Sequence, residues 1–157
     1  ISFTLVAVFT VEKLGRKPLL IFGSIGMAVG ALGVALTFGN AALSTVTMIS
    51  IMVYSASFMF SWGPIAWVLI AELFPNTIRG AAVAIAVAFQ WIFNFIVSST
   101  FVPMFNMHLT PGDDFGHWFT YGLYGVICIL AAIFVWKLVP ETKGKTLEDM
   151  SKLWRKE

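Results

Sequence analysis

The stretch SWGPIAWVLIAELFPNTIRG, residues 61–80, decides the fold of this chain. It stays uncharged until Glu72 and shows its first basic residue at Arg79. Gly63 and Pro64 interrupt the apolar run, because a proline inside a helix removes one backbone hydrogen bond and clashes with the preceding turn. Lipid tolerates such a break only where neighbouring helices or a wet cavity satisfy the freed backbone groups. The stretch therefore predicts the broken end of a membrane span, with Gly63 and Pro64 as its hinge.

The composition of the whole chain points to the same setting. Of its 157 residues, 59% are hydrophobic and 11% are charged, whereas soluble proteins carry about 25% charged residues. The mean hydropathy is +0.87. We therefore predict an all-α integral membrane protein in contact with the lipid bilayer. The chain begins with Ile1 inside an apolar segment, and we interpret it as a piece of a longer protein.

The apolar segments set the predicted organisation. A spanning helix needs about 20 apolar residues, and residues 1–11 are too few, so we expect them to be the end of a further helix. Four longer segments are predicted to span the membrane, and they cover residues 19–38, 46–72, 80–105 and 117–137.

Charge placement predicts the topology. Every Lys and Arg falls within residues 12–18, 73–80 or 137–157, and the polar stretches 39–45 and 106–116 contain none. Cytoplasmic loops are enriched in Lys and Arg, so the first three regions are predicted to be cytoplasmic. We expect a multi-pass protein of the plasma (inner) membrane. No soluble domain exists to present these basic residues to nucleic acid, and we exclude that partner.

The tail, residues 140–157, is predicted to carry a short amphipathic helix on the cytoplasmic surface. Its apolar positions recur at helical spacing between charged residues, at Leu147, Met150, Leu153 and Trp154.

Glycines mark a packing face in the first complete span. They recur at intervals of three and four, which places them on one side of a helix where another backbone can approach closely. These residues are Gly23, Gly26, Gly30 and Gly33. We interpret them as residues of helix packing.

Two tryptophans flank the predicted hinge. Trp62 lies ten residues before Glu72, about 15 Å deep by helical rise, which is too deep for the usual interfacial position of tryptophan. Trp67 lies five residues before Glu72, so depth alone leaves interfacial anchoring and a binding role both open for it.

Two amides lie deep in the next span. Gln90 is ten residues from Gly80, again about 15 Å deep, and Asn94 shares its helical face. Burying an unpaired amide in hydrocarbon costs several kcal/mol, so both must face other helices or a wet cavity. Interhelical hydrogen bonding is one interpretation. The other is a polar-substrate site, in which amides bind hydroxyl groups and an indole covers the apolar face of a ring.

Other reactive residue types predict little chemistry. Cys128 lies alone in an apolar run, where cysteine behaves as a small buried hydrophobe, and disulfides are excluded. His108 and His117 flank a loop without the spacing of metal ligands, and both are predicted to be solvated loop residues. We expect no metal, no cofactor and no enzymatic activity.

Four motifs taken together resemble the sugar porter family of the major facilitator superfamily. EKLGRK at 12–17 is similar to the superfamily loop D-[KR]-x-G-R-[KR], with Glu12 where the pattern prefers Asp. GPIAW at 63–67, AELFP at 71–75 followed by Arg79, and PETKG at 140–144 are similar to marks of the sugar porters.

The resemblance covers the whole chain and implies the C-terminal part of a twelve-helix transporter. Residues 1–11 would be the end of helix 8, followed by helices 9–12 and the cytoplasmic tail helix. It implies transport of a monosaccharide, such as D-xylose or a hexose, by alternating access and through proton-coupled symport. This chain would supply part of the transporter, and the proton-binding acid would lie in the other half.

The resemblance also implies roles for individual residues. Trp67, Gln90 and Trp91 would contact the sugar, with Asn94 one turn beyond Gln90. Four charged residues would join Glu12 in a cytoplasmic network that closes the two halves on the inside, and these are Arg16, Glu72, Arg79 and Glu141. From the charges alone, ordinary solvation at the membrane surface remains the alternative.

Two other classes of function remain open. A membrane receptor of the same fold would bind sugar as a sensor without net transport, and a truncated chain would be a non-functional remnant or a helix-packing partner.

Overall fold

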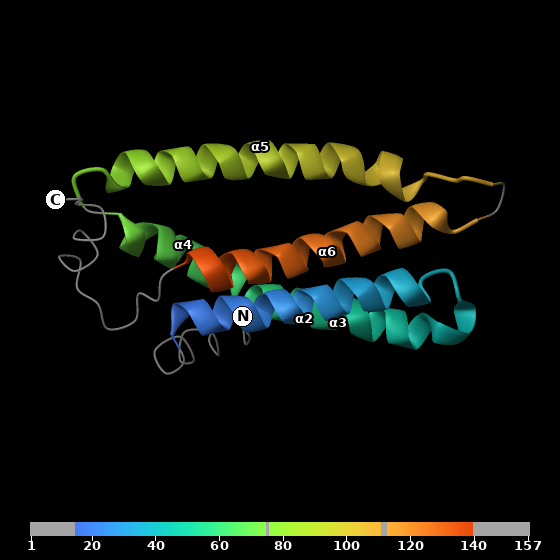
Figure 1. Ribbon diagram of the computed structural model, residues 1–157. Coiled ribbons are helices and arrows are strands. Elements are labelled where there is room, and N and C mark those ends of the chain that lie inside the picture. The colour runs from blue at the N-terminus through green and yellow to red at the C-terminus, as the bar shows by residue number, and fades with distance from the viewer. Residues whose placement is uncertain (1–14, 75, 111–112, 140–157) are drawn as a thin grey trace.

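Membrane-length helices make up the described part of the chain (Figure 1). The computed structural model describes residues 15–74, 76–110 and 113–139. In chain order the elements are α2 (Arg16–Thr37), η1 (Ala41–Leu43), α3 (Ser44–Phe60), α4 (Trp62–Leu73), α5 (Arg79–Phe105) and α6 (Phe115–Leu138). Within the described ranges, four segments are long and apolar enough to cross a membrane, namely Arg16–Thr37, Ala41–Ile70, Arg79–Phe105 and Phe115–Leu138. The prediction of an all-helical chain is confirmed.

Helix α2 makes the most extensive contacts, with α6 and with α3. It begins at Arg16 because Gly15 adopts φ 94°, a left-handed conformation that glycine takes readily. Pro18 then falls in the first turn, where its missing N–H has no helical partner to lose. Cys128 of α6 is a free cysteine buried against Met27 of α2, as a small hydrophobe would be.

The predicted glycine face of α2 packs against α3. A Cβ at Gly30 would lie 2.7 Å from the backbone N of Tyr54 and 2.8 Å from the carbonyl oxygen of Ser50. A Cβ at Gly23 would overlap the side chain of Ser61. Since only hydrogen atoms fit at these positions, the two backbones approach closely. The prediction that the glycines serve helix packing is confirmed.

The second span breaks at Ser61, between α3 and α4. Ser61 has φ −124° and ψ −79°, outside the helical range. Pro64 is the third residue of α4, where a missing N–H leaves no helical bond unmade. In an unbroken helix its ring would clash with the carbonyl of Phe60. The interruption therefore precedes Pro64 by one turn, and the hinge role of Gly63 and Pro64 stays a prediction.

Helix α5 contacts α6 and α4 and lies on the far side of α6 from α2 (Figure 1). All its residues from 88 to 100 are exposed in the described structure. The helix therefore presents a long apolar face that the described residues leave uncovered.

Aromatic rings join the helix ends near the α5–α6 loop. The His117 ring centroid lies 4.5 Å from that of Phe38 and 4.2 Å from that of Phe105. Its side chain is 19% exposed. The prediction that His117 is a solvated loop residue is wrong, because it lies in the first turn of α6 and its imidazole packs against these two phenylalanine rings. His108 is 52% exposed, as predicted.

Asp113 organises the same loop. Its Oδ2 accepts hydrogen bonds from the backbone N–H of Leu109 at 3.0 Å, and from the N–H and hydroxyl of Thr110 at 2.7 Å and 3.0 Å. Burial of the Asp113 carboxyl raises its pKa, but these hydrogen bonds lower it by more, so its pKa lies below the ordinary value of 3.8.

The glycine face generates a stability prediction. We expect Gly30→Ala to destabilise the protein by about 1–3 kcal/mol, because the new methyl group must push α3 away from α2. The matched control is Gly122→Ala in α6, where no atom outside the neighbouring backbone of the same helix lies within 4 Å of the added Cβ, and where alanine favours the helix. Thermal unfolding midpoints of the purified protein in detergent measure both. Equal midpoints for the two variants would contradict the packing described.

The Asp113 carboxylate generates a pH prediction. Its folded pKa is lowered, so its contribution to loop order is complete above the unfolded pKa and is lost as the pH falls through the folded pKa. Amide hydrogen exchange at Thr110 measures this contribution. We expect Asp113→Ala to exchange faster than the parent at neutral pH, with the ratio of rates approaching one in acid. Asp114→Ala serves as the control, because Asp114 Oδ1 lies 3.3 Å from His117 Nδ1 instead.

Candidate functional site

A cavity of about 280 Å³ opens where the broken span faces α5. It lies beside two predicted sugar contacts from different helices, Trp67 of α4 and Gln90 of α5, and beside Gly63 of the predicted hinge. The complete lining is Phe58, Trp62, Gly63, Ala66, Trp67, Ile70, Ala86 and Gln90.

Helical spacing explains this lining. Residues four apart lie on one face of a helix, and two adjacent rows of α4 reach the cavity. One row holds Trp62, Ala66 and Ile70, and the other holds Gly63 and Trp67. Small side chains in both rows leave the space between α4 and α5 unfilled. The break at the start of α4 therefore determines which residues face the cavity.

Two of the predicted contacts lie outside this lining. Trp91 lies about 100° around the helix from Gln90 and does not line the cavity; it is 69% exposed, and Gln90 is exposed as well. Asn94 is also exposed, and its Oδ1 accepts a hydrogen bond from Ser98 Oγ at 3.3 Å. A sugar role for either residue stays a prediction.

The other lining residues were not among the predicted sugar contacts. Phe58 and Trp62 lie on either side of the break, and Ala86 lies one turn before Gln90. The signal that could have found Ala66 and Ile70 is their four-residue spacing from Trp62. Using it requires knowing that α4 begins at Trp62.

The predicted cytoplasmic charges are only partly within the described residues. Arg79 is the first residue of α5, and its Nε and Nη2 each donate to the carbonyl of Phe74 at 3.4 Å. This contact caps the carbonyl end of α4. Arg16 begins α2. Glu12, Glu141 and the side chain of Glu72 lie outside the described residues, so the charge network stays a prediction.

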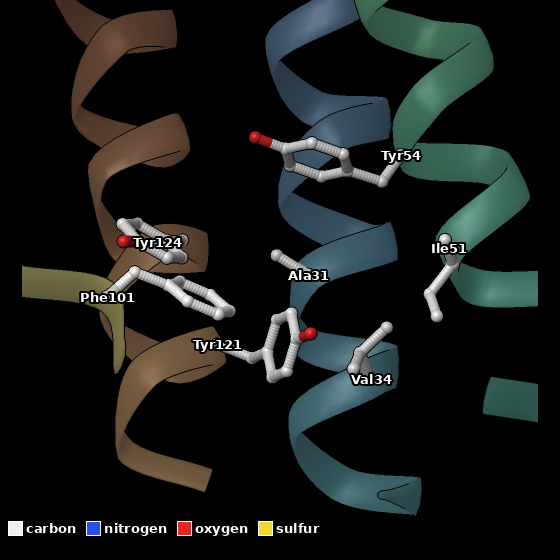
Figure 2. A pocket seen from close by; sticks show the side chains of 7 residues that line it. All are labelled: Ala31, Val34, Ile51, Tyr54, Phe101, Tyr121 and Tyr124. Carbon is white, nitrogen blue, oxygen red and sulfur yellow. The ribbon is translucent and has the colours of Figure 1, made fainter. Parts of the chain in front are cut away.

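A second cavity of about 230 Å³ lies between α2, α3 and α6, next to Phe101 of α5. Figure 2 shows the rings of Tyr54 and Tyr121 extending from α3 and α6 into this space. Its other lining residues are Ala31, Val34, Ile51 and Tyr124. None of the predicted site residues is among them, so the cavity beside Trp67 and Gln90 is the candidate site.

The chemistry of the candidate cavity is that of binding. The Gln90 amide can donate and accept hydrogen bonds, and the indoles offer broad apolar faces. Its lining contains no ionisable group and no nucleophile. Within the described ranges, no three His, Cys, Asp or Glu side chains form a group that could hold a metal ion.

Comparison with known proteins identifies the family. The model of the family described as "Sugar (and other) transporter" matches residues 1–154. The D-xylose-proton symporter of Escherichia coli strain K12 is 49% identical over 100% of this chain and 32% of its own length. The glucose transport protein of Synechocystis is 44% identical over 94% of this chain and 32% of its own length.

Solved structures give the same result at the level of the fold. The inward-open xylose transporter XylE from E. coli has a TM-score of 0.86 at 49% identity, over 98% of this chain and 33% of that chain. XylE bound to 6-bromo-6-deoxy-D-glucose, a proton:xylose symporter of the major facilitator superfamily, also has a TM-score of 0.86 over 98% of this chain and 32% of that one.

The chain thus spans about a third of the length of the relatives it matches. The family resemblance stated from the motifs is confirmed. Because the family model matches nearly the whole sequence, this chain belongs to the sugar transporter family of multi-pass membrane proteins and is not an enzyme.

Proposed function

We propose that the chain is part of a transporter that moves a monosaccharide across the membrane by alternating access, coupled to protons. The observation that carries this proposal is the cavity that Trp67 and Gln90 line from two different helices. The relatives that match include a D-xylose-proton symporter and an arabinose-proton symporter of Bacillus subtilis. Together with the glucose transport protein of Synechocystis, they make the proposed substrate class a pentose or a hexose.

The chemistry of the cavity suits such a ligand. A sugar ring has hydroxyl groups around its edge and C–H groups on its faces. The Gln90 amide would bind hydroxyls, and the Trp67 indole would cover a C–H face. The volume of about 280 Å³ is near the lower end of the range for ligand pockets, about 300–1,000 Å³, and the rest of the site would come from the other half of the transporter.

The helices would correspond to the last four of a twelve-helix transporter. In this assignment α2 is helix 9, α3 and α4 together are helix 10, α5 is helix 11 and α6 is helix 12. Residues 1–11 would end helix 8. Sites in transporters are typically formed near the bilayer midplane by discontinuous helices, and the break at Ser61 supports this assignment.

Proton coupling would depend on an acid outside this chain. None of the acidic residues of the sequence falls in the middle of an apolar span. The cytoplasmic charges would have a different task. Arg16 and Arg79 would pair with acids among Glu12, Glu72 and Glu141 to close the inner side while the site faces outward.

The site assignment predicts sugar-specific defects. In the full-length transporter, we expect Gln90→Ala and Trp67→Ala each to raise the KM for D-xylose or glucose uptake about tenfold, since loss of one hydrogen bond or stacking contact with the sugar has roughly that effect. Trp136→Ala is the matched control, because this indole is 63% exposed at the other end of α6 from the loop. An unchanged KM in both site variants would refute the assignment.

The gate assignment predicts a shift in access to the cavity. We expect Glu72→Gln to favour the inward-open state, because it removes a charge that would hold the inner side closed. The reporter is Ala86→Cys in a Cys128→Ala background. In inside-out vesicles the cytoplasmic side faces the medium, so the rate at which an impermeant maleimide labels this cysteine measures access to the cavity from that side. Glu148→Gln in the tail is the control. Equal labelling rates for parent and Glu72→Gln would leave Glu72 a solvated residue at a helix end.

A further inference from the structure

Ser24 of α2 contacts one wall of the candidate cavity without lining the cavity itself. The Trp62 indole, a lining residue, donates from Nε1 to Ser24 Oγ at 2.7 Å. Ser24 Oγ donates in turn to the carbonyl of Leu20 at 2.8 Å. The serine is fully buried at 0% exposure. Its hydroxyl therefore acts as acceptor and donor at once, and both capacities are used.

Trp62 occupies a position where its orientation matters. It is the first residue of α4, directly after the break at Ser61. Its ring packs against two separate core clusters, one around Leu19 and Ile65 and the other around Met27. Packing restricts the plane of the indole, and the hydrogen bond to Ser24 selects the direction of its N–H edge. The same bond links the start of α4 to α2.

We infer that Ser24 is a positioning residue for the candidate sugar cavity, which it serves by fixing the Trp62 indole. This inference rests on the proposed function. It concerns a residue that the motifs leave without a role, because Ser24 lies on α2 and the predicted sugar contacts lie on α4 and α5.

A similar hydrogen-bond pair elsewhere separates positioning from simple cross-linking. Thr47 Oγ1 donates to Thr37 Oγ1 at 2.8 Å, and Thr37 Oγ1 donates to the carbonyl of Gly33 at 2.7 Å. This pair also joins α2 to the second span through a hydroxyl bonded to the carbonyl four residues earlier. Neither threonine lines the candidate cavity. Thr37→Val is therefore a matched control that removes the same kind of bond.

The test is sugar uptake by the full-length transporter with KM and Vmax measured separately. We expect Ser24→Ala to raise KM about fivefold to tenfold, with Vmax within about twofold of the parent. Thr37→Val should leave KM unchanged. In a Trp62→Phe background, which lacks the indole N–H, Ser24→Ala should have no further effect on KM, because its influence passes through that donor.

Each alternative result is decisive. Ser24→Ala with the KM of the parent overturns the inference, as does a full additional effect of Ser24→Ala in the Trp62→Phe background. An equal rise of KM in Thr37→Val would show general loosening of the helices and would also overturn it.

A measurement without sugar separates this inference from the proposed function. The indole ¹⁵N–¹H resonance of Trp62 is expected to shift in Ser24→Ala and to stay in place in Thr37→Val. If the resonance shifts as expected but Gln90→Ala and Trp67→Ala leave uptake unchanged, the positioning of Trp62 by Ser24 is supported and the sugar assignment alone fails. If Gln90→Ala impairs uptake but the Trp62 resonance does not respond to Ser24→Ala, the positioning role is refuted.

Discussion

The close approach of α2 and α3 is the contact on which the rest of the structure depends. In lipid, helices gain no hydrophobic energy from meeting, so they associate through packing and interhelical hydrogen bonds. The glycines of α2 provide the packing, since a Cβ at Gly30 would lie within 3 Å of the α3 backbone. Gly23 lies opposite Ser61, the residue at which the second span breaks. Two features therefore favour a break at Ser61. Gly23 leaves room on α2 for the Ser61 side chain, and the Pro64 ring would clash with the preceding turn of an unbroken helix.

The chain changes its packing partners at the break, and a cavity forms beyond it. Helix α3 follows α2 closely, whereas α4 packs against α5 as well as α2. Because Gly63, Ala66 and Ala86 carry little or no side chain, the helices leave a space that the larger Trp67 and Gln90 only partly fill. Trp62 lies directly after the break, in contact with both core clusters and bonded to α2. The packed pair α2 and α3 thus supports α4, which forms one wall of the cavity, and α5 forms the opposite wall.

Much of the fold was predictable, because lipid leaves a chain of this composition few options beyond spanning helices. That Trp67 and Gln90 lie near each other was implied by the family motifs, whereas depth alone left the role of Trp67 open. The remaining lining residues were not predictable in this way, since they depend on the helical phase after the break, and that phase follows from contacts with α2. Helical phase also explains why Trp91, a predicted sugar contact, does not line the cavity. It adjoins Gln90 in sequence, but the turn of the helix takes it away from the cavity. His117 was misjudged because its residue type favours water while two phenylalanine rings surround it.

The composition of the cavity wall limits what this chain contributes under the proposed function. A monosaccharide has several hydroxyl groups, and each needs a partner when it leaves water. The described lining provides the Gln90 amide and the indole N–H groups of Trp62 and Trp67, and that of Trp62 is already bonded to Ser24. Most hydroxyl partners must therefore come from groups beyond this lining, and those partners would discriminate one sugar from another. The wall described here would supply stacking surface, one amide and the indole N–H of Trp67. Such a wall would not by itself distinguish one monosaccharide from another, which agrees with the presence of xylose, arabinose and glucose transport proteins among the relatives.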